Sequence, residues 1–161
     1  MKRVLAFTVV VVALLSAAPA FAAVTSAPVS AAGVTPDEMA QLMSQYGWPA
    51  HIAKGADGGP IINSRIAGVK FDVRFFECQS GRCRDIQFAV GWSNAQPPTV
   101  TLDKVNAWNG SHRFLRTYLT PDHALWAVMD ARIARGSTAN VEENLVLWQA
   151  MLSEFRPYFR L

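Results

Sequence analysis

Two stretches in which apolar and polar residues alternate, joined by a short loop between two cysteines, constrain the fold of this chain most. The apolar members are spaced by two residues: Val69, Phe71, Val73 and Phe75 in the first stretch, and Ile86, Phe88, Val90 and Trp92 in the second. This spacing gives a strand one apolar face and one polar face. The loop between Cys78 and Cys83 contains Gly81 and is short, so the two stretches predict an antiparallel hairpin with one buried face.

Parity along this hairpin predicts where the two cysteines point. Cys78 shares the parity of Lys70 and Asp72, and Cys83 shares that of Asp85, so we expect both sulfur atoms on the polar, solvent-facing side. In a hairpin with this loop, the two cysteines stand opposite each other at a separation that a disulfide can close. Free thiols or a redox pair are the alternatives, although the missing C-x-x-C spacing disfavours catalytic thiol exchange.

Two further segments predict helices before and after the hairpin. Thr35 is a favourable N-cap, and Glu38 three residues later completes a capping box for a helix that should end near Gly47. A second, short helix is expected over residues 101–109, with Gly110 ending it.

The clearest helix lies at the C-terminal end of the chain. Its apolar residues are spaced by threes and fours: Val141, Leu145, Trp148, Leu152, Phe155 and Phe159. Such a stripe predicts a helix that packs one face on a sheet. We expect Asn140 to cap its start and Pro157 to close it, because a proline in the last turn removes a donor and clashes with the preceding turn.

The remaining strand signals complete the fold class. Short strands are expected near His51 and Ile61, separated by a glycine-rich turn at residues 55–59, and a second hairpin is expected from residues 113–119 and 124–130. The predicted order is therefore α-β-β-β-β-α-β-β-α. This order predicts an α+β domain in which helices cover one face of an antiparallel sheet.

The first residues have the features of a secretory signal peptide. Lys2 and Arg3 precede an apolar run over residues 4–18, and Pro19 is followed by an A-x-A site that predicts cleavage after Ala22. The run is too short for an ordinary membrane-spanning helix. We therefore expect export to the periplasm or the medium, where a disulfide can persist.

The segments that follow define a linker and one domain. Residues 23–34 are small or weakly apolar and predict a flexible linker, and residues 35–161 are long enough for a single domain with its own core. Without Lys2 and Arg3 the formal net charge falls from +3 to +1, with no run of basic residues. This balance argues against nucleic acid or, after signal cleavage, a membrane surface as the main partner.

The common catalytic and metal-binding motifs are absent from the sequence. His51, His112 and His123 stand far apart, without the spacing of a metal site, so no metal or other cofactor is expected. No G-x-S-x-G elbow, G-x-G-x-x-G loop or P-loop occurs. We therefore assign no catalytic residue and expect the protein not to be an enzyme.

One segment combines amides, guanidinium groups and aromatic rings. Its candidate partner-binding residues are Asn106, Trp108, Asn109, Arg113 and Arg116. Structurally, the asparagines would bond a helix end and a turn while the tryptophan fills the core. Functionally, the two arginines would present forks to a carboxylate beside an aromatic surface. Both interpretations stay open at this point, and the structural one is favoured.

The hairpin over residues 75–88, the run Val105-Asn106-Ala107-Trp108-Asn109 and the following Arg113-Phe114 resemble the YbjN-domain family in order and spacing. Members of that family are described as bacterial sensory transduction regulators. The resemblance extends from Thr35 to the C-terminal residue. It implies an α+β fold similar to type III secretion chaperones and a protein-binding module, either monomeric or homodimeric, without known catalysis.

These observations lead to one main expectation and two alternatives. We expect an exported, non-enzymatic binding or regulatory protein that holds an unidentified protein or peptide partner. One alternative is a small periplasmic hydrolase with a site near Asn106, His112 and Arg113, which would need a pocket with a strongly perturbed acid or base. The other is a small-ligand or lipid carrier, which would need a closed apolar cavity.

Overall fold

The computed structural model describes residues 30, 32–93, 100–133 and 137–161. The expected signal peptide over residues 1–22 and residues 23–29 and 31 of the expected linker lie outside these described residues. The described part contains nine elements: α1 Pro36–Gln45, β1 Ala50–Lys54, β2 Pro60–Ile66, β3 Val69–Gln79, β4 Arg82–Trp92, α2 Leu102–Ser111, β5 Leu115–Leu119, β6 Leu125–Arg132 and α3 Thr138–Phe159. Their order is the predicted one, and the α+β fold class is confirmed.

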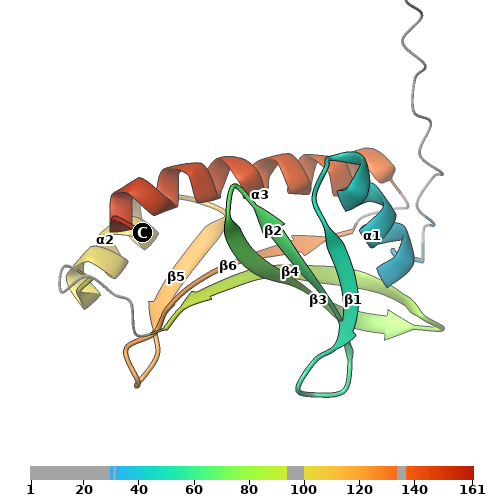
Figure 1. Ribbon diagram of the computed structural model, residues 1–161, viewed down its shortest axis with the longest axis horizontal. Coiled ribbons are helices and arrows are strands. Elements are labelled where there is room, and N and C mark those ends of the chain that lie inside the picture. The colour runs from blue at the N-terminus through green and yellow to red at the C-terminus, as the bar shows by residue number, and fades with distance from the viewer. Residues whose placement is uncertain (1–29, 31, 94–99, 134–136) are drawn as a thin grey trace, which may run out of the picture.

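The strands form one antiparallel sheet in the order β1-β2-β3-β4-β6-β5. Figure 1 shows α3 lying along one face of this sheet, with α1 near one of its ends and α2 near the other. The described helices are thus all on one side of the strands. The opposite side, called the open face below, carries the outward-pointing residues of every strand.

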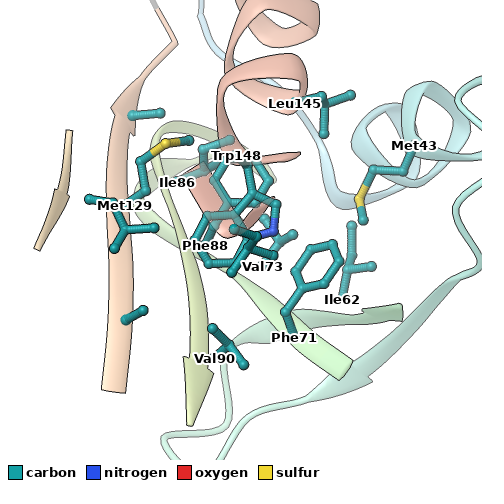
Figure 2. Close-up of a cluster of buried hydrophobic side chains, with 14 of the residues drawn as sticks. Met43, Ile62, Phe71, Val73, Ile86, Phe88, Val90, Met129, Leu145 and Trp148 are labelled. Atoms are coloured by element: carbon teal, nitrogen blue, oxygen red, sulfur yellow. The ribbon is translucent and has the colours of Figure 1, made fainter. Parts of the chain in front are cut away.

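The core lies between α3 and the inward face of the sheet. Figure 2 shows Phe71, Phe88 and Met129 from the strands gathered around Trp148 of α3. The rings of Trp148 and Phe88 stack with their centroids 5.4 Å apart, and both side chains are fully buried. Burial of each such side chain stabilises the fold by about 1.5–3 kcal/mol, so this layer fixes which face of the hairpin points inward.

The start of α1 is formed as the sequence predicts. The Thr35 hydroxyl accepts a hydrogen bond from the Glu38 amide, and the Glu38 carboxylate accepts one from the Thr35 amide, which completes the capping box. Glu38 also receives two hydrogen bonds from the Arg82 guanidinium, at 3.0 and 2.8 Å. The cap therefore ties α1 to the tip of the β3–β4 hairpin.

Two helix ends differ from the sequence expectation. Helix α2 continues past Gly110 to Ser111, because the His112 amide still donates to the Trp108 carbonyl. Helix α3 continues past Pro157 to Phe159, whose buried ring stabilises the final turn more than the lost proline donor weakens it.

The start of α3 also differs from the expectation. Ser137, and not Asn140, is the N-cap, and its hydroxyl accepts a hydrogen bond from the Asn140 amide. Serine and asparagine are about equally favourable at this position, so the sequence alone did not separate the two.

The hairpin between β3 and β4 has the predicted register, with Cys78 opposite Cys83 and a disulfide between them. The expectation that both sulfur atoms lie on the wet side was wrong for Cys83, which is 1% exposed. Its amide and carbonyl pair with those of Val34, a fully buried residue that was expected to end the flexible linker. This N-terminal residue covers the second cysteine, which parity alone cannot reveal.

Candidate functional site

The open face of the sheet is hollowed between β1 and β6. Two pockets of about 480 and 330 Å³ meet there and share Lys70, Phe71 and Asp72. We call this region the open-face hollow and define it by six lining residues: His51, Asn63, Arg65, Lys70, Asp72 and Trp126. It faces away from α3 and combines charged, polar and aromatic lining residues, which makes it the candidate site.

Strand register explains why these side chains gather. His51 pairs with Asn63 and Asn63 pairs with Asp72, so the three form a row across β1, β2 and β3. Arg65 pairs with Lys70 in the next row. Paired residues in a sheet point to the same face, and the inward face here is taken by the apolar residues of the alternating pattern.

Asp72 is the acidic group of the hollow. Burial raises the pKa of its carboxyl above the ordinary value, although the charge of nearby Arg74 acts in the opposite direction. Its cross-strand neighbours are Asn63 and Ala89, neither of which carries a charge. The carboxylate therefore costs more to keep ionised here than in water.

The basic groups of the hollow are not neutralised within the described residues. Arg65 and Lys70 stand directly opposite each other on adjacent strands, and neither forms an ion pair with any described side chain. Like charges placed directly opposite each other destabilise a sheet. An arrangement of this kind is stabilised when an anion lies between or beside the two groups.

The half of the open face over β4, β5 and β6 is different. Arg116 lies 3.4 Å from the Asp130 carboxylate, which also accepts a 2.6 Å hydrogen bond from Gln87. Arg132 lies 3.8 Å from Asp85. The charges of this half are thus paired across strands, whereas Arg65 and Lys70 near β1 have no ion-pair partner in the described part of the chain.

Trp126 forms the aromatic wall of the hollow. Its ring lies over Gly91 on the neighbouring strand, where an added Cβ would come within 2.7 Å of ring atoms, so only glycine fits. The Arg74 guanidinium lies 5.4 Å from the ring centroid, a cation–π contact. The indole is therefore held flat on the sheet and stays partly exposed.

The structure gives Trp108 and Asn109 roles inside the fold. Trp108 is fully buried, and its indole N–H donates to the Leu115 carbonyl at 3.1 Å. The Asn109 amide donates to the Thr117 carbonyl and accepts from the Thr117 N–H, both at 2.9 Å. The two residues thus bind the backbone of β5, as the structural interpretation of this segment expects.

The other residues of that segment lie at the surface and do not form one cluster. Asn106 is exposed on α2, and the Arg113 guanidinium lies 5.4 Å from the ring of exposed Phe114. Arg116 points to the open face, where Asp130 already engages it. A partner-binding role for these three residues stays a prediction.

The Ser111–His112 pair comes nearest to a catalytic arrangement. The Ser111 hydroxyl lies 2.9 Å from His112 Nδ1, but it also donates to the Ala107 carbonyl at 2.7 Å. His112 Nε2 lies 4.0 Å from the Glu154 carboxylate, which is too long for a hydrogen bond, and the imidazole stacks on Trp108. The relay that a nucleophilic serine requires is therefore not formed.

The described residues form neither a metal centre nor a membrane span of helical type. They contain no group of His, Cys, Asp and Glu that could hold a metal ion. Among those same residues, no helix is sufficiently long and apolar to span a bilayer.

Sequence reasoning missed most of the hollow. Lys70, Asp72 and Arg74 were expected on the polar face, but their neighbours across the sheet depend on the strand order, which the sequence pattern did not supply. A signal for Trp126 was available, since Leu125, Ala127 and Met129 alternate as inward, buried residues of β6, and this alternation leaves the tryptophan pointing outward.

Comparison with known proteins gives one match. The YbjN family model, described as "Putative bacterial sensory transduction regulator", matches residues 35–161. No curated protein and no solved structure matches the chain significantly, so the likeness to type III secretion chaperones stays a prediction. Because the family match extends from the N-cap of α1 to the last residue and covers most of the chain, this protein belongs to the YbjN family.

Proposed function

We propose that this protein is an exported, non-enzymatic binding or regulatory protein that holds a protein or peptide partner in the open-face hollow. The observation that carries the proposal is a sheet face that none of the described helices covers, with a partly exposed aromatic ring and cations that have no ion-pair partners in the described residues. Aromatic and arginine side chains are enriched at protein interfaces. The regulator description of the family agrees with such a role.

A site-directed photo-crosslinking experiment in the native compartment tests this function. A photoreactive amino acid replaces Asn63 in the hollow, and a matched control replaces Val146, which is 53% exposed on α3. We expect discrete adducts from position 63 that are absent from position 146. An adduct of twice the chain mass would identify the partner as a second copy. Equal adducts from both positions, or none, would overturn the proposal.

Export is part of the proposal and has its own measurement. The signal peptide predicts a mature chain that begins after Ala22 and is recovered from the periplasm or the medium. N-terminal sequencing of the fractionated protein checks this. Recovery of the full-length chain from the cytoplasm would contradict export, but it would not contradict the proposed binding role.

The hydrolase alternative was expected near Asn106, His112 and Arg113, and the Ser111–His112 contact described above is the arrangement of that segment that comes nearest to it. A fluorophosphonate probe labels activated serines, so it distinguishes the two functions directly. We expect no labelling of the folded protein. Labelling that is lost in Ser111→Ala would favour the enzyme.

The carrier alternative has less support. The two pockets of the hollow are lined by charged and polar side chains, including Arg65, Lys70 and Asp72. A lipid carrier needs a closed apolar cavity instead.

A further inference from the structure

The two edges of the sheet are formed by β5 and β1, which stand at the two ends of the strand order. At the β5 edge, the outward backbone groups of Leu115 and Thr117 are taken by Trp108 and Asn109, as described above. An edge whose backbone groups are taken in this way cannot accept another strand.

The β1 edge lacks such partners. Strand β1 pairs with β2 alone, and no hydrogen bond from a described side chain reaches its outer side. The Gly55 amide bonds the Gly59 carbonyl in the same register. Because bonded and non-bonded pairs alternate along an antiparallel ladder, the N–H and C=O of Ile52 point away from β2.

The side chains beside the β1 edge determine which kind of peptide strand it would favour. Ile52 is 46% exposed and offers an apolar contact next to buried Ile62. On the open face, His51 of β1 lies in the row next to that of Arg65 on β2 and Lys70 on β3. Arg65 and Lys70 are the two cations without ion-pair partners among the described residues. The free edge and the free cations therefore lie side by side.

From this juxtaposition we infer that the β1 edge and the adjoining part of the hollow bind an extended acidic peptide, which adds to the sheet as a further strand. The inference rests on the proposed function and names the partner class for the same site. Alternate residues of the added strand point to the open face, where their carboxylates meet the cations, while the others lie beside Ile52.

Strand spacing makes this geometry feasible. Neighbouring strands are about 4.8 Å apart, so an added strand lies roughly 10 Å from the backbone of Arg65, a gap that a glutamate and an arginine side chain span together. Lys70 is one strand further away, so it attracts a carboxylate only when the two side chains reach to within about one Debye length, about 8 Å at physiological salt.

The test uses a labelled short peptide in which valine and glutamate alternate, with fluorescence anisotropy as the readout. The control peptide replaces every glutamate by lysine. We expect the acidic peptide to bind, the basic peptide not to bind, and affinity to fall as salt is raised. Equal binding of both peptides, or binding of neither, overturns the inference.

Two variants separate the edge from the charge. Ile52→Pro removes the outward N–H without removing a bond to β2, and should abolish binding while circular dichroism shows a folded protein. Arg65→Gln with Lys70→Gln should weaken binding about tenfold or more. The control pair is Arg84→Gln with Arg132→Gln, two arginines outside the hollow that both lie near the Glu77 carboxylate, at 3.6 and 3.5 Å, and it should leave binding unchanged. Unchanged binding in either test variant overturns the inference.

The same variants distinguish this inference from the proposed function. If native adducts at Asn63 persist in both Ile52→Pro and the Arg65/Lys70 double variant, the binding function stands and the acidic-strand assignment fails. If Ile52→Pro changes the sedimentation coefficient of the free protein, a second copy occupies the edge and the assignment also fails. If no adducts form in the wild type, the proposed function itself fails.

Discussion

At one edge of the sheet, α2 supplies a tryptophan and an asparagine that bond the backbone of β5, whereas at the other edge none of the described residues bonds the outward backbone groups of Ile52 in β1. Edge strands are normally protected because they can template aggregation. This fold protects β5 with dedicated side chains and leaves β1 short, with Lys54 at its end. The difference shows that the β5 edge is closed by side chains of α2, whereas the β1 edge is available for contact with another chain.

The largest effect should come from removing the tryptophan that supports β5. Trp108→Ala deletes a fully buried ring and the donor to Leu115, so the free energy of unfolding should fall by about 3–5 kcal/mol. Urea denaturation followed by circular dichroism measures this loss. Asn106→Ala, on the exposed side of the same helix, is the control and should stay within about 0.5 kcal/mol. Similar losses in both variants would mean that α2 does not brace the edge.

The asparagine of the same edge should matter less. Asn109→Ala removes two hydrogen bonds to Thr117, so we expect a loss of about 2 kcal/mol and faster hydrogen exchange of the Thr117 amide. Asn109→Asp keeps the acceptor for that amide but loses the donor to the carbonyl, and should lie between Ala and wild type. If Thr117 exchanges as slowly in Asn109→Ala as in wild type, the edge is protected by something else.

The pKa values of two carboxyl groups are shifted in opposite directions: that of Glu38, at the cap of α1, is lowered, and that of Asp72, in the open-face hollow, is raised. For Glu38, burial acts to raise the pKa, but hydrogen bonds from Arg82 and Thr35 and the charge of Arg82 together hold it below its ordinary value of 4.5. The contribution of Glu38 to stability is therefore present above that value and is lost as the pH falls through the lower, folded-state pKa. For Asp72 the raised pKa gives the opposite sign, since its protonation on acidification favours the folded state.

These signs predict the pH dependence of two variants. Glu38→Gln should lower stability at neutral pH by less than about 1 kcal/mol, because the ion pair is partly exposed, and the deficit should shrink in acid. Asp72→Asn should raise stability at neutral pH, with a gain that shrinks in acid. Thermal unfolding between neutral and acidic pH measures both. If the stability difference from wild type changed with pH in the same direction for both variants, the assigned directions of the two pKa shifts would be contradicted.

The smallest effect is expected at the open edge. Ile52→Ala alters a side chain that is already 46% exposed, so the free energy of unfolding should change by less than about 1 kcal/mol. Leu115→Ala on the protected edge removes a side chain that is 1% exposed and should cost about 2–5 kcal/mol. Equal costs in the two strands would erase the distinction between the edges.

The elements that sequence could predict are those with a local cause. Alternation in β3 and β4 and the apolar stripe of α3 follow from side-chain periodicity, which a chain carries within each segment. Contacts between distant segments were not accessible in this way. Cys83 is buried because Val34 pairs with it, and Asn109 reaches Thr117 because α2 packs on β5.

The candidate site depends even more on distant contacts. Lys70 could be placed on a polar face, but its position opposite Arg65 requires the register of β2 against β3. Strand register is set by turn geometry and by which face is buried, and neither is visible in the weak β1 and β2 signals.

Trp126 on the open face also gives the molecule a built-in optical reporter. Trp108 and Trp148 are fully buried and Trp48 nearly so. Trp92 is partly exposed but stacks on Phe155 of α3, on the helix side of the sheet, whereas the partly exposed Trp126 indole lies on the open face beside the Arg74 guanidinium. A molecule settling over this ring would displace water from it and change the wavelength and quenching of its emission. Intrinsic fluorescence can therefore follow occupancy of the hollow without any added dye.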